Sequence, residues 1–288
     1  MIDHVLLLHI GPIRKFKLVG VLNELTTRDI DRWVTHLSRN SIKELILFLW
    51  DSGYKIPLCV FSCQDLVRLE FTQCMLKPPS TFKGFSSLKS LQLIAVDMGQ
   101  DVFEILIRSS PLLEKLTLRH CEGVSNLKIN APNLKYMHVL GTFDVVNLES
   151  ALNITEAEVY VSIHSESAYD RWVPDSWKPS SSSNLLKIFD HLPRIRRLEI
   201  KWHFLKYLSL GALPEKLPKP CQYLKVLSMD LCFDDPDAIQ TALCILISSP
   251  ALQELEIYMD DSKKLTRSPS VVEQQNSSCF EVHLCLRE

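Results

Sequence analysis

The chain has 288 residues, of which 46% are hydrophobic and 23% charged, as in an average globular protein, so disorder is excluded for most of its length. Its formal net charge is −2, from 32 basic and 34 acidic side chains, which gives no overall attraction to nucleic acid or to an anionic membrane. The 8 glycines are under half the average share of about 7%, and none form G-x-G-x-x-G or a Walker loop, which excludes the usual phosphate-binding enzymes.

The N-terminal residues, MIDHVLLLHIGP, carry no basic leader, and their apolar run from Val5 to Leu8 is too short for a secretory signal. No stretch approaches the roughly 18 apolar residues of a membrane helix. Nine cysteines without such a signal are typical of free thiols in a reducing compartment. We therefore expect an intracellular protein, cytoplasmic and/or nuclear, with no membrane partner.

One six-residue pattern, apolar-x-x-apolar-x-apolar, recurs along the chain. Successive copies start 29, 24, 22, 25, 21, 20, 41, 29 and 28 residues apart, and most of these intervals fit a leucine-rich repeat of about 20–29 residues. The ten copies start at Ile13, Ile42, Leu66, Leu88, Leu113, Leu134, Ile154, Ile195, Leu224 and Leu252. Three of them extend to L-x-x-L-x-L-x-x-C, ending at Cys74, Cys121 and Cys232.

Each copy predicts a short strand with alternating faces. In LVRLEF, Leu69 and Phe71 would point inward and Arg68 and Glu70 outward. A single strand cannot bury its apolar face, but stacked copies form a parallel sheet over a continuous core. The sequence thus predicts an α/β leucine-rich-repeat solenoid, a horseshoe with the parallel β-sheet on the concave face and helices or irregular turns on the convex face.

The connecting segments contain three predicted helices. Residues 27–40 carry Ile30, Trp33, Val34 and Leu37 on one helical stripe. Residues 100–111 carry a second apolar stripe, which comprises Val102, Phe103, Leu106 and Ile107. Residues 235–250 begin with the cap-like Asp-Pro-Asp, and the predicted helix stops before a proline.

The domain prediction is a solenoid over residues 1–260 followed by a polar tail over 261–288. Within the 41-residue interval, residues 165–184 contain a serine run, two prolines and two tryptophans, so we expect residues 164–184 to be a loop inserted into the array.

With these repeats, the chain resembles the plant F-box/FBD/LRR-repeat family. The resemblance rests on VLLLHIGPIRKFKL (5–18), on SSPLLEKLTLRHCEG (109–123) with LKINAPNLKYMHVLG (127–141), and on ISSPALQELEI (247–257). In that family an N-terminal F-box binds the adaptor subunit of a cullin-RING ubiquitin ligase, the repeats present a substrate, and an FBD module closes the C-terminus. We expect the F-box to be absent here and residues 261–288 to hold the start of a truncated FBD module, so an adaptor partner requires an F-box supplied elsewhere.

Reactive constellations are weak. Cys59 and Cys63 are spaced C-x3-C, with Cys74 and His36 as conceivable zinc partners, but a strong zinc signal needs two close pairs, so buried thiols are favoured. The acidic cluster at 234–237 is better explained as a helix start. We expect no catalytic residues, no cofactor and no metal.

The concave face is the candidate binding surface, because solenoids bind partners there. Its outward side chains have mixed charge, basic at the first strand and acidic at the last, and show none of the basic run with aromatics that nucleic acid requires. The candidate partner-binding residues are Ile46, Phe48, Trp50, Arg68, Glu70, Gln92, Lys115, Arg119, Tyr136, His138, Arg197 and Glu199.

The segment ILFLW places three large apolar side chains, Ile46, Phe48 and Trp50, on the face expected to meet solvent. This indicates either an anchor for a partner or a strand that the chain's own insert or N-terminal segment covers.

The preferred function is a non-catalytic protein-interaction module, the substrate-recognition repeat region of an F-box/LRR-like protein. The alternatives are a substrate adaptor of an SCF-type cullin-RING ubiquitin ligase and a small-molecule-binding repeat receptor, which an enclosed concave pocket would indicate.

Overall fold

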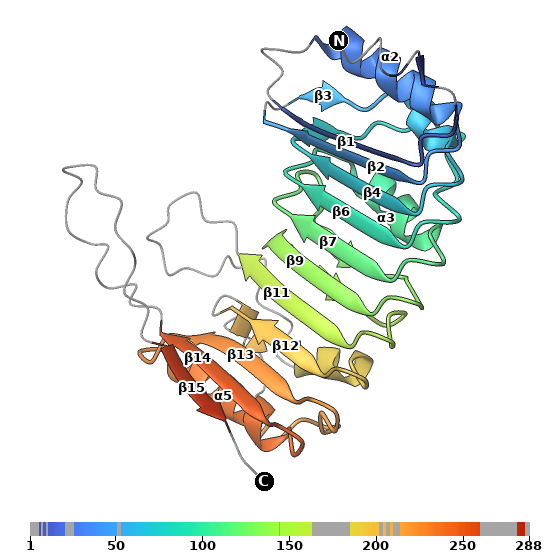
Figure 1. Cartoon of the computed structure of the whole chain (residues 1–288). Coiled ribbons are helices and arrows are strands. Elements are labelled where there is room, and N and C mark those ends of the chain that lie inside the picture. Colours follow the sequence, from blue (N-terminus) through green and yellow to red (C-terminus); the bar gives the residue numbers. More distant parts are fainter. Residues whose placement is uncertain are drawn as a thin grey trace, which may run out of the picture. The chain divides into compact units, whose positions relative to one another are not determined.

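The structure, a computed structural model, describes residues 6, 8–9, 11–20, 26–50, 53–143, 145–162, 185–201, 204–205, 208–209, 214–259 and 281–285. The chain divides into two compact units, residues 1–152 (unit 1) and 153–288 (unit 2), and each is built of stacked leucine-rich repeats (Figure 1). The predicted inserted loop, 164–184, and residues 261–280 of the predicted tail lie outside the described residues, so both stay predictions.

Unit 1 contains a parallel sheet in which neighbouring strands come from successive repeats. Its strand order follows the sequence: β1 (Lys15–Gly20), β2 (Glu44–Leu49), β4 (Arg68–Thr72), β6 (Ser90–Ile94), β7 (Lys115–Arg119) and β9 (Tyr136–Thr142). Two short parallel pairs, β3 (Tyr54–Lys55) with β5 (Cys74–Met75) and β8 (Asn126–Lys128) with β10 (Val145–Asn147), continue the repeats beyond the turns.

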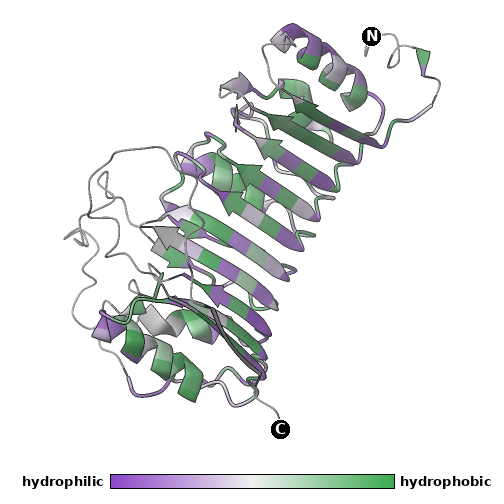
Figure 2. Cartoon of the chain, turned by 60° about the vertical axis from the view of Figure 1, so that its left-hand side comes forward, coloured by the Kyte–Doolittle hydropathy of each residue, from purple (hydrophilic) through white to green (hydrophobic). Residues whose placement is uncertain are grey.

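Alternation along each strand creates the core, as the period of two predicts. Leu69 and Phe71 of β4 pair in register with Leu45 and Leu47 of β2, and all four side chains are at most 2% exposed. Hydrophobic and hydrophilic residues therefore alternate along the strands (Figure 2). The predicted α/β leucine-rich-repeat fold is confirmed in both units.

A left-handed residue ends three successive strands of unit 1. Gln73, Ala95 and His120 have φ of 55°, 50° and 50°, and each donates its backbone N–H to a carbonyl of the next strand, at 2.7–2.9 Å. This turn carries the chain off the sheet and points the following residue, such as Cys74, into the core. The repeat's cysteine position just after the turn is buried at Cys74 and half-buried at Cys121 and Cys232.

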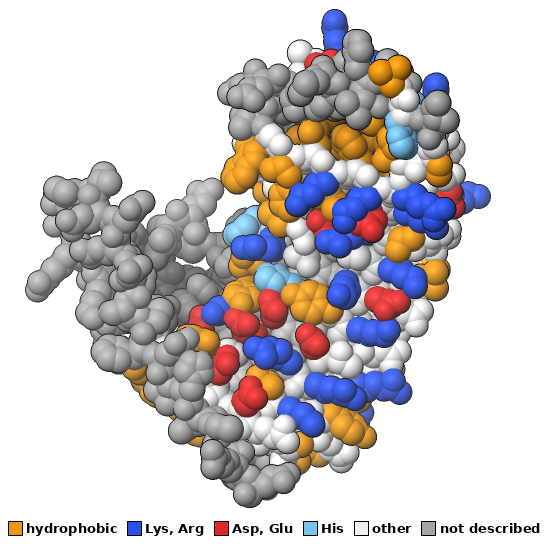
Figure 3. All heavy atoms as spheres, viewed as in Figure 1, with side chains coloured by type: hydrophobic (Ala, Val, Ile, Leu, Met, Phe, Trp, Pro, Cys, Tyr) orange, Lys and Arg blue, Asp and Glu red, His pale blue; other side chains and the backbone are white. Residues whose placement is uncertain are grey.

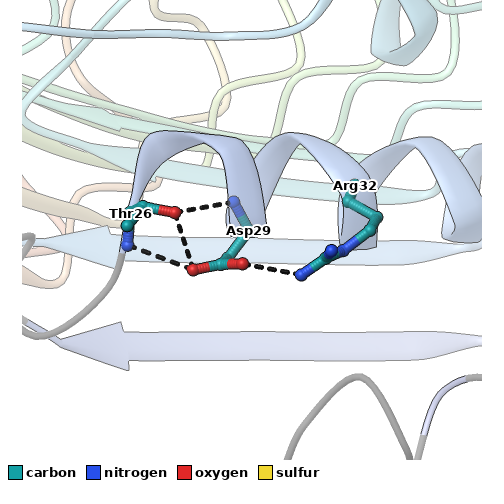
Figure 4. Close-up of polar contacts among 3 residues, drawn as sticks. All are labelled: Thr26, Asp29 and Arg32. Carbon is teal, nitrogen blue, oxygen red and sulfur yellow. Dashed lines mark hydrogen bonds and ion pairs between the residues drawn. The ribbon is translucent and has the colours of Figure 1, made fainter.

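Helix α2 (Thr27–Ser38) buries the predicted stripe of Ile30, Trp33, Val34 and Leu37. Its start is fixed by a capping box in which the Thr26 hydroxyl accepts from Asp29 N–H at 3.2 Å and the Asp29 carboxylate accepts from Thr26 N–H at 3.4 Å (Figure 4). The Thr26 hydroxyl also donates to that carboxylate at 2.6 Å. The bond from Thr26 is the main reason that the pKa of Asp29 is lowered.

Helix α3 (Gln100–Arg108) buries Phe103, Leu106 and Ile107 and ends at a Ser-Ser-Pro segment. There the Ser110 hydroxyl donates to the Leu106 carbonyl at 2.7 Å, satisfying an unpaired group of the last turn. Val102 of the predicted stripe is only half-buried. The connection before β4 is a 3-10 helix, η1 (Leu58–Ser62).

Unit 2 repeats this plan with β11 (Glu156–Ser162), β12 (Arg197–Ile200), β13 (Val226–Leu231) and β14 (Glu254–Met259) in parallel order, preceded at β12 by the 3-10 helix η3 (Leu185–His191). Strand β15 (Glu281–Cys285) adds antiparallel to β14.

Helix α5 (Pro236–Ile247) of unit 2 follows β13. Its N-cap is Asp235, whose carboxylate accepts from two backbone N–H groups, as the Asp-Pro-Asp start predicts. Its end repeats the serine bond of α3, with the Ser249 hydroxyl donating to the Ile245 carbonyl at 2.7 Å. Two segments behind the family resemblance therefore perform the same helix-ending role.

Candidate functional site

The side of each parallel sheet that faces away from the core presents rows of side chains in register, which we call the outer face of the unit. In unit 1 each row takes one residue from each of the six strands. The first row is Lys15, Glu44, Arg68, Ser90, Lys115 and Tyr136; the second is Lys17, Ile46, Glu70, Gln92, Thr117 and His138; the third is Val19, Phe48, Thr72, Ile94, Arg119 and Leu140. Ten of the twelve predicted residues thus belong to this unit.

The apolar anchor is smaller than the sequence predicts. Ile46 does belong to an outer-face row, but it is 3% exposed, so the expectation that it meets solvent is wrong. It lies between Lys17 and Glu70 of the adjacent strands, whose long side chains stand close at strand spacing.

Trp50 is open to solvent at the end of β2. It is 67% exposed and its backbone N–H donates to the Gly20 carbonyl at 3.1 Å, which holds it beside the end of β1. Val19, which the sequence reading missed, is 52% exposed and registers with the half-buried Phe48. The outward positions of β2 and its end are therefore buried at Ile46 and open at Trp50, and the predicted insert, 164–184, lies outside the described residues.

Both carboxylates of the unit 1 outer face are engaged by cations. Lys15 Nζ lies 3.1 Å from the Glu44 carboxylate on the adjacent strand. Arg68 Nε donates to the Glu70 carboxylate at 2.6 Å, and Glu70 is only 7% exposed. Glu70 was predicted to contact a partner, but the structure buries it under its own Arg68.

Three cations of this face are not paired with its carboxylates. Lys17 lies over the Phe48 ring, with Nζ 5.9 Å from the centroid. Lys115 and Arg119 are exposed at the two ends of β7, and neither forms an ion pair with another described residue. The outer face of unit 1 is therefore basic, with an apolar group at the ends of its first two strands.

The outer face of unit 2 is acidic. It carries the predicted Arg197 and Glu199, and its carboxylates are Glu156, Glu158, Glu199, Asp230, Glu254 and Glu256. Figure 3 shows carboxylates gathered over this unit.

Lys201 is the centre of a cluster in unit 2 that the sequence reading did not single out. Its Nζ lies 3.0 Å from the Asp230 carboxylate, 3.6 Å from that of Glu199, and 5.1 and 5.2 Å from the ring centroids of Tyr160 and Tyr258. Burial, and then the hydrogen bond that Tyr160 donates to Glu199, raise the pKa of Tyr160. Alignment of the outward residues of successive repeats could have revealed this cluster, because the four partners of Lys201 come from the consecutive strands β11 to β14.

The described thiols are buried or half-buried: Cys63, Cys74, Cys221 and Cys244 are buried, and Cys59, Cys121 and Cys232 are half-buried. Burial raises the pKa of Cys63 to about 11 and that of Cys74 to about 12, which disfavours the thiolate needed for nucleophilic or metal-binding chemistry. Within the described part of the chain, no three His, Cys, Asp or Glu side chains are grouped so that they could hold a metal ion. No described helix has the length and apolar character that crossing a membrane requires.

Comparison with known proteins gives one family match. Residues 30–257 match the model for the leucine-rich repeats of FBD-associated F-box protein At5g56370. This range begins within α2 and ends within β14, so it includes the strands of both outer faces except β1 and the last residues of β14.

Relatives with curated names are similar over most of the chain. The F-box/FBD/LRR-repeat protein At1g13570 of Arabidopsis thaliana is 38% identical over 281 residues, which are 97% of this chain and 64% of the relative. The putative FBD-associated F-box proteins At5g56560 and At5g50270 of the same plant are 25% and 23% identical, over 89% and 88% of this chain and 63% and 65% of their own lengths. The chain thus spans less than two-thirds of these relatives.

Proposed function

The chain belongs to the family of leucine-rich repeats of FBD-associated F-box proteins, and on that premise we propose that it is a non-catalytic module that binds a protein partner on the outer face of unit 1. The observation that carries this proposal is the exposure of Trp50, 67%, beside Val19, on the outer face, whereas the alternating pattern places most large apolar side chains on the core side of the sheet. Exposed aromatic side chains dominate the energetics of protein interfaces.

Cross-linking tests which side of the repeats binds. A photo-reactive amino acid is placed at Thr117 on the outer face of unit 1 and, in a second protein, at Glu104 on α3, on the other side of the same repeats. After irradiation in plant extract, we expect protein adducts from position 117 and few from position 104. Equal adducts from both positions would contradict the proposed face.

Removal of the Trp50 side chain tests whether this residue anchors the partner. Trp50→Ala should weaken partner capture, and because Trp50 is mostly exposed, it should change the free energy of unfolding by no more than about 0.5 kcal/mol, or about 2 °C in Tm. Phe233→Ala is the matched control, since Phe233 is a 58% exposed aromatic in unit 2. A Tm loss of several degrees for Trp50→Ala would show that the indole packs within the unit instead.

The relatives are named F-box proteins, and we propose as a second role that the module serves as the substrate-binding part of an SCF-type cullin-RING ubiquitin ligase. Such a role requires an F-box in the same protein or supplied by another. The test is purification from plant cells scored for the ligase adaptor subunit. Stoichiometric recovery would support the ligase role, and recovery of other proteins without the adaptor would support a module that acts alone.

A further inference from the structure

We infer that the outer face of unit 1 selects an extended acidic segment carrying one bulky apolar residue. This inference rests on the proposed function and specifies the chemistry of its partner. It follows from the charge that remains on the face after internal pairing and from the position of the apolar group.

Charge complementarity sets the first requirement. The three rows hold five Lys or Arg side chains against two carboxylates, and both carboxylates are already engaged, Glu44 by Lys15 and Glu70 by Arg68. Lys115 and Arg119 are exposed on one strand with no ion pair among the described residues. An approaching segment therefore meets a net positive potential, which favours Asp and Glu and disfavours Lys and Arg.

Apolar exposure sets the second requirement. Trp50 and Val19, at the ends of β2 and β1, are more than half exposed and are the largest open apolar groups of this face. The Phe48 ring beside them is partly covered by the Lys17 ammonium. A leucine- or phenylalanine-sized side chain can cover the indole and the valine together, and such contact excludes water.

Strand spacing relates the two positions. Three intervals separate β2 from β7, because β4 and β6 lie between them. At about 4.8 Å per interval, Trp50 and Arg119 are roughly 14 Å apart across the strands, which an extended chain crosses in about four residues. The inferred segment therefore carries its acidic residues about four residues from its apolar residue.

Synthetic peptides of about eight residues, enough to cross the six strands of the unit, provide the test. The acidic peptide has one leucine and has aspartates four residues away from it. The neutral peptide has asparagines in place of the aspartates, and the reversed peptide, in which the charge is reversed, has lysines there. Binding to the full chain is measured by fluorescence anisotropy at low and high salt. We expect the acidic peptide to bind at least about tenfold more tightly than either other peptide, and less tightly as salt rises.

Two matched charge reversals locate the binding. Arg119→Glu should weaken binding of the acidic peptide by about tenfold, and Arg119→Gln by a smaller factor. Lys128→Glu should leave it unchanged, because this exposed lysine lies on β8, in a separate two-stranded sheet of the same unit. Trp50→Ala should weaken the acidic and neutral peptides equally. Thermal unfolding of each variant checks that unit 1 remains folded.

The outcomes separate this inference from the proposed function. Equal binding of acidic and neutral peptides, with both lost in Trp50→Ala, would overturn the inference and leave the binding face standing. Equal effects of Arg119→Glu and Lys128→Glu, preference for the reversed peptide, or no binding by any peptide would also overturn the inference. The cross-linking comparison of positions 117 and 104 tests the binding face independently.

Discussion

The ion pair between Arg68 and Glu70 should stabilise unit 1 by an amount that can be worked out from its geometry. The Glu70 side chain is 9% exposed and that of Arg68 45%, with the guanidinium nitrogens 2.5 and 2.6 Å from one carboxylate oxygen. Removing the partner of a buried charge costs about 3–5 kcal/mol, whereas exposed pairs contribute about 1 kcal/mol or less. Because Arg68 is nearly half exposed, solvent screening lowers the expected loss for Arg68→Ala to about 2 kcal/mol, or roughly 4–8 °C in Tm.

A double-mutant cycle in urea measures this energy. Glu70→Gln removes the buried charge, so Arg68→Ala combined with Glu70→Gln should be more stable than Arg68→Ala alone, with a coupling energy of about 1–2 kcal/mol. Lys115→Ala, on the same face but without such a pair, should change stability by no more than about 0.5 kcal/mol. The reasoning is refuted if Arg68→Ala costs no more than Lys115→Ala, or if adding Glu70→Gln restores nothing.

Two further predictions concern the backbone and the thiols. A Cβ at Gly123 would lie 2.2 Å from the Met98 carbonyl oxygen at φ +79°, whereas at Gly53, with φ +103°, nothing lies within 4 Å. Gly123→Ala should therefore cost about 2–4 kcal/mol in urea unfolding against about 1 kcal/mol for Gly53→Ala; equal losses would contradict the close approach. Burial raises the pKa of Cys63 to about 11 and of Cys74 to about 12, so the neutral thiols contribute stability that is complete below pH 8.5 and is lost as pH rises through 11–12. Mass-spectrometric mapping after iodoacetamide at pH 8 should find both unmodified in the folded chain; labelling at the rate of the unfolded chain would contradict their burial.

The inward half of the fold could be predicted from sequence because it depends on local alternation. Each apolar-x-x-apolar-x-apolar copy in the described part of the chain gives a strand, and the inward residues of the inner strands, such as Leu91 and Leu116, are fully buried. The stripe of α2 and the N-cap at Asp235 are likewise set by residues within a few positions of one another. Local pattern was sufficient for these elements.

The outward half depends on neighbours from other repeats. Ile46 and Trp50 differ by four positions on one strand and its end, and both were predicted to face solvent, yet one is 3% and the other 67% exposed. The difference comes from the strands on either side, which supply Lys17 and Glu70 beside Ile46 and place Trp50 where the first two strands end. Single-strand alternation gives the direction of a side chain but not what stands beside it.

The left-handed turns were also missed, because the residues that adopt them share no chemistry. Gln73, Ala95 and His120 occupy one repeat position with φ near 50°. What they share is a backbone bond to the next strand, which repays part of the cost of about 1–2 kcal/mol for this conformation. Such a constraint belongs to the stack of repeats and is visible only when the strands are placed side by side.

The same dependence on neighbouring strands explains how an interaction face can have a net positive or negative charge although the sequence contains no run of like charges. In unit 1 the carboxylates of Glu44 and Glu70 are each engaged by a cation one strand or two residues away, so they do not offset the remaining cations. In unit 2 a single ammonium, Lys201, is held among Asp230, Glu199 and two tyrosine rings, and the remaining carboxylates determine the sign. Although the net charge of the whole chain is only −2, the outer face of unit 1 is therefore basic and that of unit 2 is acidic. The partner that each face accepts depends on these local residual charges and not on the chain's total.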